Sequence, residues 1–388
     1  MLIGVPKEIK DQESRVSCTP AAANQFVLDG HTVLIETGAG LESGFTDQEY
    51  IEAGAIILDH AADVWAQAEM IYKVKEPIAS EYKYLRKGLI IYAYLHLAAS
   101  SVLTKELIDN QCVAIAFETI QVGSALPLLK PMSEVAGRMA IQEGARLLTK
   151  PCGGKGMVLQ GVPGVAPAHV VILGAGTVGT AATRIAVGMG ARVTVLDTNV
   201  DRLAEVGDIF LDKIETLISN SFNIAKVIKN ADMVVSSVLI PGHKAPQLIT
   251  EAMVQTMEPG SVIVDVSIDQ GGSTELTANK KTDYYAPIFI RHGIVHYLVA
   301  NIPGTVPRTS TQALSNATTR YALAIANLGW KQACRKHPEL ASGINTADGY
   351  VTYKPVAEDL NYELKNIQEL LNNKHIYLLQ ARTARKNS

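Results

Sequence analysis

Short apolar runs alternate along the chain with stretches whose apolar positions recur at helical spacing. Helical patterns such as Ala21–Leu28 and Ala61–Ala68 separate the runs in the first third of the chain. This alternation is typical of α/β layers around a mostly parallel sheet. The runs that we expect to form buried strands there are Leu2–Val5, Thr32–Glu36, Met70–Val74, Leu89–Tyr94 and Val113–Phe117.

A second series of such patterns follows a helical stretch, Glu134–Lys150, and a Gly- and Pro-rich loop, Pro151–Pro167. A long helical pattern, from about Ser310 to Cys334, comes too late in the sequence to be the next crossover of this series. We therefore expect it to return to the first domain. The later strand candidates are Val170–Leu173, Val193–Leu196, Met233–Leu239, Ser261–Val266 and Ile294–Ala300.

The most informative stretch begins where the run Val170–Leu173 ends in Gly174-Ala175-Gly176-Thr177-Val178-Gly179. Apolar residues at helical spacing follow, and the next run ends in Asp197. The order strand, glycine turn, helix, strand and acid is the fingerprint of a dinucleotide-binding unit. The sequence thus predicts two doubly wound, Rossmann-like α/β domains with mostly parallel sheets. Residues 129–306 would bind the nucleotide, and residues 1–128 with 307–388 would form a discontinuous substrate domain.

Each part of the fingerprint has a physical task. Gly174 permits the tight turn, Gly176 lets the backbone approach a pyrophosphate, and Gly179 lets the helix pack closely on the strand. The helix N-terminus offers N–H groups and a partial positive charge to phosphates. Asp197 would accept hydrogen bonds from a ribose diol and repel a 2′-phosphate, which favours NAD over NADP. Arg202 keeps NADP as an alternative cofactor, because a cation near the ribose can accommodate a 2′-phosphate. The non-functional alternative is a unit of this fold that binds no ligand.

Composition excludes several classes of function. The net charge of -3 gives no indication of nucleic-acid binding, and no uncharged apolar run is long enough to predict a membrane span. The four cysteines form no metal-ligand spacing, and we expect no bound metal. Free thiols and the absence of a secretory pattern at the N-terminus favour the cytoplasm.

Polar residues outside the glycine turn follow predicted strands, where open α/β sheets bind ligands. Lys73 and Lys75 are two residues apart on an extended strand, so their side chains would share one face. The alternative is that both are solvated lysines at a sheet edge. His96 follows a buried run and suits acid–base chemistry, or it is a core histidine or a helix cap. Asp269 precedes Gly271-Gly272, so it is either a turn former or a partner of His96 across a cleft.

Together these clusters resemble the alanine dehydrogenase family over nearly the whole chain, from Gly4 to Tyr353. The motifs that carry the resemblance are Gly4–Glu8, Lys73–Pro77, Tyr94–Ala99, Pro131–Gly137, Leu239–Gly242, Asp269–Gly272 and Val299–Gly304.

The resemblance implies a cytoplasmic homohexameric oxidoreductase that converts L-alanine and NAD to pyruvate, ammonium and NADH, and the reverse. It implies that Arg15 and Lys75 hold the substrate carboxylate and that His96 and Asp269 are the catalytic acid–base residues. Besides the glycine turn, it implies that NAD is lined by Ser133, Thr177, Val178, Asp197, Arg202, Ser219, Val238, Leu239, Val266, Ser267, Ile268, Asp269, Val299, Ala300, Asn301 and Ile302.

The chain departs from the family pattern at Ala278–Thr282, where an Arg-Pro-Thr-Thr-type stretch is common. A family arginine contact to the cofactor cannot be carried over there, and Lys280 or Lys281 is only a possible substitute.

Three alternatives remain at this point. The NAD-binding subunit of a proton-translocating transhydrogenase resembles the chain but lacks the lysine after the strand and the Leu-His-Leu motif, both of which are present here. A non-catalytic NAD sensor on the same fold is the second alternative. The third is an amino-acid dehydrogenase for a larger substrate, because one methylene changes binding by only about 1–3 kcal/mol.

Overall fold

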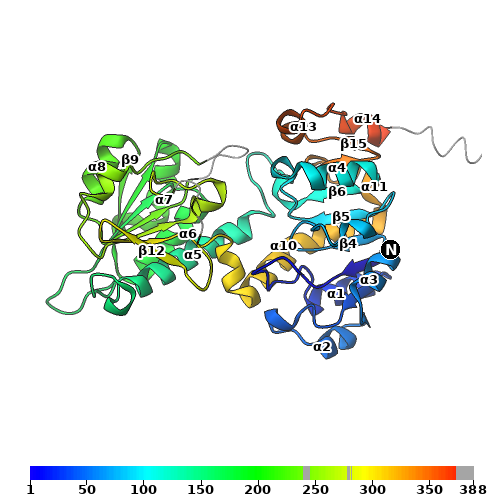
Figure 1. The fold of residues 1–388 in the computed structure, drawn as a ribbon, viewed down its shortest axis with the longest axis horizontal. Helices are drawn as coiled ribbons and strands as arrows, with labels where there is room; N and C mark the ends of the chain where they lie inside the picture. Colours follow the sequence, from blue (N-terminus) through cyan, green and yellow to red (C-terminus); the bar gives the residue numbers. More distant parts are fainter. Residues whose placement is uncertain (239–244, 278–279, 281, 373–388) are drawn as a thin grey trace, which may run out of the picture. The chain divides into compact units, whose positions relative to one another are not determined.

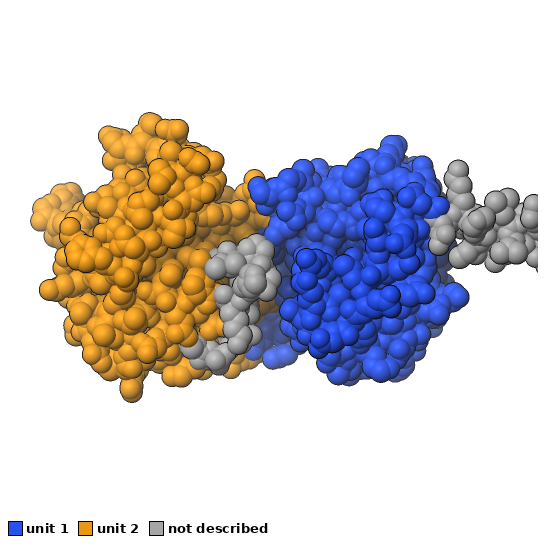
Figure 2. Space-filling model, turned by 90° about the horizontal axis from the view of Figure 1, so that it is seen from above, with its two compact units in different colours: residues 1–129, 307–388 blue, residues 130–306 orange. Residues whose placement is uncertain are grey.

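The computed structural model describes residues 1–238, 245–277, 280 and 282–372, apart from the side chains of Asp269 and Gln270. The chain divides into two compact units (Figure 2). Unit 1 comprises Met1–Leu129 and Pro307–Ser388, and unit 2 comprises Lys130–Val306. Each unit has its own sheet and its own core.

Unit 1 contains an eight-stranded sheet in the order β15-β14-β6-β5-β4-β1-β2-β3. The first six strands of the chain are parallel in the order 3-2-1-4-5-6, the Rossmann arrangement. Two C-terminal strands add an antiparallel edge next to β6. The strands are β1 (Leu2–Val5), β2 (Thr32–Glu36), β3 (Ile56–Leu58), β4 (Met70–Tyr72), β5 (Ile90–Ala93), β6 (Val113–Ala116), β14 (Ile344–Ala347) and β15 (Tyr350–Val351).

Helices cover both faces of this sheet, as in a doubly wound fold. On one face, α3 (Ala61–Gln67), α4 (Ser101–Asp109) and α13 (Lys354–Leu360) bury apolar residues against alternate strand positions such as Ile71 and Ile91. On the other face, Tyr72 packs against Phe26 of α1 (Pro20–Leu28) and bonds to Thr318 of α10 (Pro307–Leu328). Figure 1 shows α10 and α11 (Trp330–Lys336) beside the strands of unit 1. The smaller helices are α2 (Asp47–Glu52), α12 (Glu339–Gly343) and α14 (Ile367–Asn372).

Unit 2 repeats the arrangement with a seven-stranded sheet in the order β12-β13-β11-β10-β7-β8-β9. Six strands are parallel, and β12 pairs with β13 in the antiparallel sense at one edge. The glycine turn follows the first strand, next to the point where the strand order reverses. The strands are β7 (His169–Leu173), β8 (Arg192–Asp197), β9 (Ile214–Ile218), β10 (Met233–Ser236), β11 (Val262–Asp265), β12 (Ile288–Arg291) and β13 (Ile294–Tyr297).

Helices of unit 2 also lie on both faces. The helices α5 (Lys130–Leu147) and α6 (Thr177–Gly188) pack tightly together, since a Cβ on Gly137 would lie 2.2 Å from the Val178 carbonyl. The opposite face buries Ile224 and Ile228 of α8 (Ser221–Ile228) and Val254 of α9 (Glu251–Val254) against the sheet. The helix α7 (Val200–Phe210) follows β8. Among the described residues, no helix is long and apolar enough to span a membrane.

The predicted α/β class with two doubly wound, mostly parallel sheets is confirmed, but the single helix predicted from Ser310 to Cys334 is wrong. The helix α10 ends at Leu328, and α11 starts at Trp330. Between them, Gly329 has a φ of 73°, a left-handed conformation that ends a helix and that glycine adopts at little cost. The strands β3, β9, β12 and β15 lie at sheet edges and were not predicted. The strand β14, which lies inside the sheet beside β15, was also not predicted.

Candidate functional site

The glycine turn of unit 2 has the geometry that its sequence predicts. Gly174 has a φ of 100°, and a Cβ on Gly179 would lie only 1.7 Å from the Gly174 carbonyl oxygen. A Cβ on Gly176 would meet nothing within 4 Å. Gly176 caps α6 without a side-chain hydrogen bond to the first turn of the helix. The turn therefore leaves open space in front of a twelve-residue helix, whose first N–H groups point toward it.

Asp197 lies at the end of the neighbouring strand, β8, and faces this turn. One carboxylate oxygen accepts a hydrogen bond from Ala175 N at 2.7 Å, and the other accepts one from Asn199 N at 2.8 Å. Arg202 donates from Nη2 to the Ala175 carbonyl at 2.7 Å and pairs with Glu205. The guanidinium is thus bound to the turn and to a carboxylate, which disfavours its use for a 2′-phosphate.

The other residues predicted to line NAD lie mostly at the carboxyl ends of the parallel strands of unit 2. Ser219 follows β9, Val238 follows β10, the segment Val266–Ile268 follows β11, and Val299–Ile302 follows β13. Ser133 lies on α5 and is half-buried. Leu239 and Lys281 lie outside the described residues, and of Asp269 only the backbone, in the 3-10 helix Val266–Gln270, is described. Lys280 is exposed, with its ammonium 5.3 Å from the centre of the Phe289 ring.

These features fit a dinucleotide. The open space at Gly176 accommodates a pyrophosphate, the N-terminus of α6 supplies donors, and Asp197 supplies acceptors at the end of the adjacent strand. Across the described residues, no group of three or more His, Cys, Asp or Glu side chains is placed to hold a metal ion.

Asp265, the last residue of β11, organises the loop after it. Its carboxylate accepts hydrogen bonds from Ser267 N at 3.0 Å, Ser273 N at 2.8 Å and Thr277 Oγ1 at 2.8 Å. Burial raises the pKa of Asp265, although the hydrogen bonds from Ser273 and Thr277 oppose this. Asp265 thereby fixes both ends of the segment that contains Asp269.

In unit 1, a buried ion cluster lies where the strand order reverses, between β1 and β4. The Lys73 ammonium lies 2.7 Å from Glu81 Oε1 and 3.4 Å from Glu8 Oε2. The other oxygen of Glu8 accepts hydrogen bonds from Val74 N at 2.6 Å and Lys75 N at 3.3 Å. Because β4 ends at Tyr72, Lys73 and Lys75 do not share a strand face as predicted. Lys73 is structural, and Glu8 fixes the bend that carries Lys75.

Arg15 and Lys75 supply positive charge at the same edge. Arg15 is buried, and its Nε and Nη2 donate to the two oxygens of Glu13 at 2.6 and 2.5 Å. Lys75 is half-buried, and among the described residues its ammonium has neither an ion pair nor a hydrogen bond. Burial, followed by the charge of Arg15, lowers the pKa of Lys75. A half-buried, unpaired ammonium beside a guanidinium is suited to bind an anion.

His96 follows β5 and is held by a carboxylate from the 3-10 helix Phe117–Thr119, which follows the neighbouring strand β6. Glu118 accepts hydrogen bonds from His96 N at 2.7 Å and Leu95 N at 3.2 Å, and it lies 3.8 Å from His96 Nδ1. The imidazole stacks on Tyr94, with 6.2 Å between ring centres, and its side chain is 49% exposed. The ring is therefore accessible rather than a core histidine.

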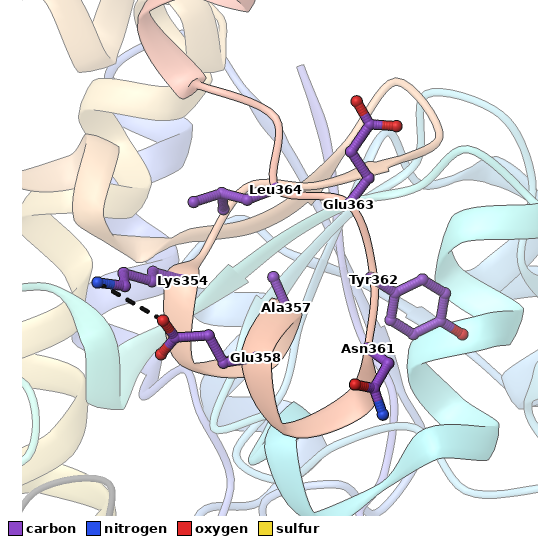
Figure 3. A pocket seen from close by; sticks show the side chains of 7 residues that line it. All are labelled: Lys354, Ala357, Glu358, Asn361, Tyr362, Glu363 and Leu364. Atoms are coloured by element: carbon purple, nitrogen blue, oxygen red, sulfur yellow. Dashed lines mark ion pairs between the residues drawn. The ribbon is translucent and has the colours of Figure 1, made fainter.

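The hollows of unit 1 coincide only partly with this edge. A hollow of about 10 Å³ is lined by Glu8, Glu13, Arg15 and neighbouring loop residues. A larger hollow, about 430 Å³, lies around α13 and contains none of the predicted site residues. Figure 3 shows its lining, where Lys354 and Glu358 form an ion pair with a separation of 3.5 Å. We place the candidate site at the strand ends because the charged groups converge there.

Sequence reasoning missed two of the carboxylates that hold the candidate groups, Glu13 and Glu118, and it named Glu8 only within the motif Gly4–Glu8. Glu118 comes directly after a predicted strand, the same position that singled out His96, so this signal was present in the sequence. Glu13 and Glu8 lie in a loop without periodicity, and their partners become evident only when the chain is folded.

Two family models match the chain. The family described as the N-terminal domain of alanine dehydrogenase/PNT matches residues 4–136, and the C-terminal domain of alanine dehydrogenase/PNT matches residues 140–354.

Curated relatives and solved structures agree with these matches. An alanine dehydrogenase of Methanococcus maripaludis is 58% identical over 365 residues, covering 93% of this chain and 98% of the relative. An alanine dehydrogenase of Bacillus subtilis is 56% identical over 363 residues, covering 94% and 96%. A solved L-alanine dehydrogenase superposes with a TM-score of 0.90 at 46% identity, covering 93% of this chain and 99% of the other. A transhydrogenase from Sinorhizobium meliloti shares the fold, with a TM-score of 0.76 at 22% identity and coverage of 91% and 99%.

Proposed function

The chain belongs to the alanine dehydrogenase/PNT family, and we propose that it catalyses the NAD-dependent, reversible conversion of L-alanine and water to pyruvate and ammonium. The observation that supports this proposal is that Arg15 lies near enough to Lys75 to lower its pKa, while His96 follows β5, the parallel neighbour of the strand that precedes Lys75. The family relationship confirms the oxidoreductase class and NAD as cofactor, and the transhydrogenase is only a distant relative.

In this mechanism, Arg15 and Lys75 bind the carboxylate of alanine. Arginine presents parallel N–H donors and lysine a compact point charge, so together they fix both the position and the orientation of the carboxylate. NAD, when bound, supplies the acceptor for the hydride that leaves Cα. The fixed carboxylate restricts which face of Cα is presented to that acceptor.

His96 and Asp269 would move the protons. Loss of hydride from the neutral amine gives an iminium, water adds to it, and ammonia leaves. A base must accept protons from the ammonium and from the attacking water, and an acid must protonate the leaving amine. We assign this exchange to His96, whose half-exposed ring can pass protons to solvent, with Asp269 as its partner.

In the same proposal, residues 1–128 with 307–388 form the substrate domain and residues 129–306 form the NAD-binding domain. We further propose a homohexamer in the cytoplasm, as the family resemblance implies. Free thiols at all four cysteines support a reducing compartment, and light scattering of the purified protein tests the assembly.

The test is formation of NADH, followed by absorbance, with a panel of L-amino acids and either NAD or NADP. We expect L-alanine with NAD to give the highest kcat/KM. The His96→Ala variant should bind NAD normally and lose at least about a hundredfold in turnover, the low end for acid–base groups. Absence of NADH with alanine and NAD would contradict the function, and near-normal turnover of the variant would contradict the role of His96.

A further inference from the structure

The carboxylate of Glu13 is hydrogen-bonded to the guanidinium of Arg15. The proposed function assigns the same guanidinium to the substrate carboxylate. Glu13 is 6% exposed and Arg15 is 3% exposed, and two N–H groups of the guanidinium donate to the two Glu13 oxygens. Burial alone would raise the pKa of Glu13, but the adjacent Arg15 outweighs it and holds that pKa below its ordinary value. Glu13 is therefore a fixed negative charge inside the site.

The neighbouring paired lysines add no surplus positive charge to this pair. Lys10 pairs with Glu76, and Lys73 pairs with two carboxylates, Glu81 and Glu8. Burial raises the pKa of Glu8. The Glu13–Arg15 pair is neutral, and Lys7, which lines the same small hollow, is exposed to solvent. Lys75 is thus the partly buried ammonium here that has no ion pair among the described residues. Glu13, Arg15 and Lys75 together carry one positive charge.

One positive charge matches one carboxylate. The single carboxylate of alanine or pyruvate would neutralise the site, whereas a second carboxylate would remain uncompensated. Such a charge is costly in a largely buried place, because burial weakens solvation and strengthens repulsion from Glu13. Glu13 would thus discriminate by charge, independently of the size of the pocket.

We propose that Glu13 is a specificity-determining residue, which neutralises Arg15 and so restricts the site to substrates with one carboxylate. The inference rests on the proposed function, because it takes Arg15 and Lys75 as the carboxylate-binding groups. In it, Arg15 supplies oriented donors, Lys75 supplies the net charge, and Glu13 excludes dicarboxylic amino acids and 2-oxo acids.

The test uses two anions of nearly equal size, oxamate with one negative charge and oxalate with two. Both approximate pyruvate in size, so a difference between them reports charge. Each is measured as a competitive inhibitor against pyruvate. We expect the wild-type protein to bind oxamate at least about tenfold more tightly than oxalate, a modest effect for a unit charge in such a site.

The Glu13→Gln variant keeps the shape of the side chain and removes its charge. We expect it to shift the ratio of the two inhibition constants toward oxalate by at least about tenfold. Glu42→Gln is the matched control, since Glu42 is exposed beside the same small hollow and its loss changes the net charge equally. The control should leave the ratio unchanged.

Equal binding of oxamate and oxalate by the wild-type protein would overturn the proposal, even if Glu13→Gln does not fold. An unchanged ratio in a folded Glu13→Gln variant would overturn it as well. If wild-type protein forms no NADH from alanine, or if neither anion inhibits, the proposed function itself fails. These results distinguish the two claims.

Discussion

His96 has a backbone conformation that residues other than glycine seldom adopt, with φ at 48°. Such a conformation persists only where surrounding contacts stabilise it. Here the contacts are the hydrogen bonds from Leu95 N and His96 N to Glu118. The carboxylate therefore positions the imidazole through its backbone, and charge-assisted bonds of this kind are among the stronger ones.

We expect Glu118→Gln to lower kcat about tenfold while changing the KM for alanine little, because the substrate carboxylate is held elsewhere. A neutral amide weakens both bonds that keep the His96 backbone in place. The amide protons of Leu95 and His96 should also exchange faster with solvent. Steady-state kinetics and hydrogen exchange check this, and unchanged values in both would show that Glu118 does not position His96.

At the residue scale, the sequence selected candidates by their position after an apolar strand, as for Lys75, His96 and Asp197, and their roles stay predictions. It did not predict that the Arg15 guanidinium is hydrogen-bonded to the Glu13 carboxylate, or that Lys73 belongs to a structural ion cluster. Those outcomes depend on which carboxylate lies opposite each cation after folding, and sequence spacing does not contain this information.

At the element scale, the glycine turn holds β7 and α6 so close together that no side chain fits at Gly179. Gly174 belongs to the glycine turn, and Gly179 belongs to the first turn of α6. A clash between these two residues would therefore push the helix away from the strand. Gly188 lies at the end of the same helix, where an added Cβ would meet nothing within 4 Å, and it serves as the control.

Gly179→Ala should destabilise unit 2 by at least about 2 kcal/mol and weaken NAD binding, because overpacked sites displace the backbone. Gly188→Ala should be neutral or stabilising by about 0.5–1 kcal/mol, since alanine favours helix. Urea unfolding and NAD titration measure both. Equal stability of the two variants would contradict the close packing.

The strand β13 contains a second element-scale feature, a buried histidine. His296 is 0% exposed, stacks on Phe289 with 4.7 Å between ring centres, and its two ring nitrogens have no hydrogen-bond partner among the described residues. Burial, aided by the charges of His292 and Lys280, lowers the pKa of His296 from 6.5 to about 4. The folded state therefore requires the neutral ring.

Stability should fall as the pH falls from about 6.5 to about 4, because the unfolded chain binds a proton in this range and the folded chain does not. Between neutral pH and about pH 4.5, this one group should cost about 2–3 kcal/mol. His296→Leu should remove that part of the pH dependence, as urea unfolding at the two pH values would measure. The same loss in both proteins would exclude His296 as its source.

Element prediction succeeded for central strands and failed at edges and ends. Central strands such as β7 and β11 are continuous apolar runs because both faces are covered by helices. Edge strands such as β12 are partly exposed and carry weaker patterns. The break at Gly329 was missed because the apolar spacing continues across it, whereas a left-handed glycine ends the helix regardless of that spacing.

At the scale of the whole molecule, the two units share the strand order 3-2-1-4-5-6 but differ at the point where it reverses. In unit 2, glycines leave space there, as a dinucleotide requires. In unit 1, Glu8, Lys73 and Glu81 fill the same point, and the cation Lys75 lies beside them. One topology thus provides a nucleotide site and a candidate anion site.

The sequence predicted this class of fold from periodicity, and its family from ordered motifs, which the family matches and relatives confirm. Periodicity alone could not predict the antiparallel strands β14 and β15, which extend the sheet of unit 1 from a segment distant in the sequence. The pairing of β14 with β6 is a tertiary contact between residues more than two hundred positions apart.

The central claim is that hydride passes directly from Cα of L-alanine to NAD. L-alanine carrying deuterium at Cα is incubated with the wild-type protein and NAD, and the products are analysed by mass spectrometry. The account predicts deuterium in the reduced nicotinamide and none in the pyruvate. Reduced cofactor without deuterium, or no reduced cofactor at all, would contradict it.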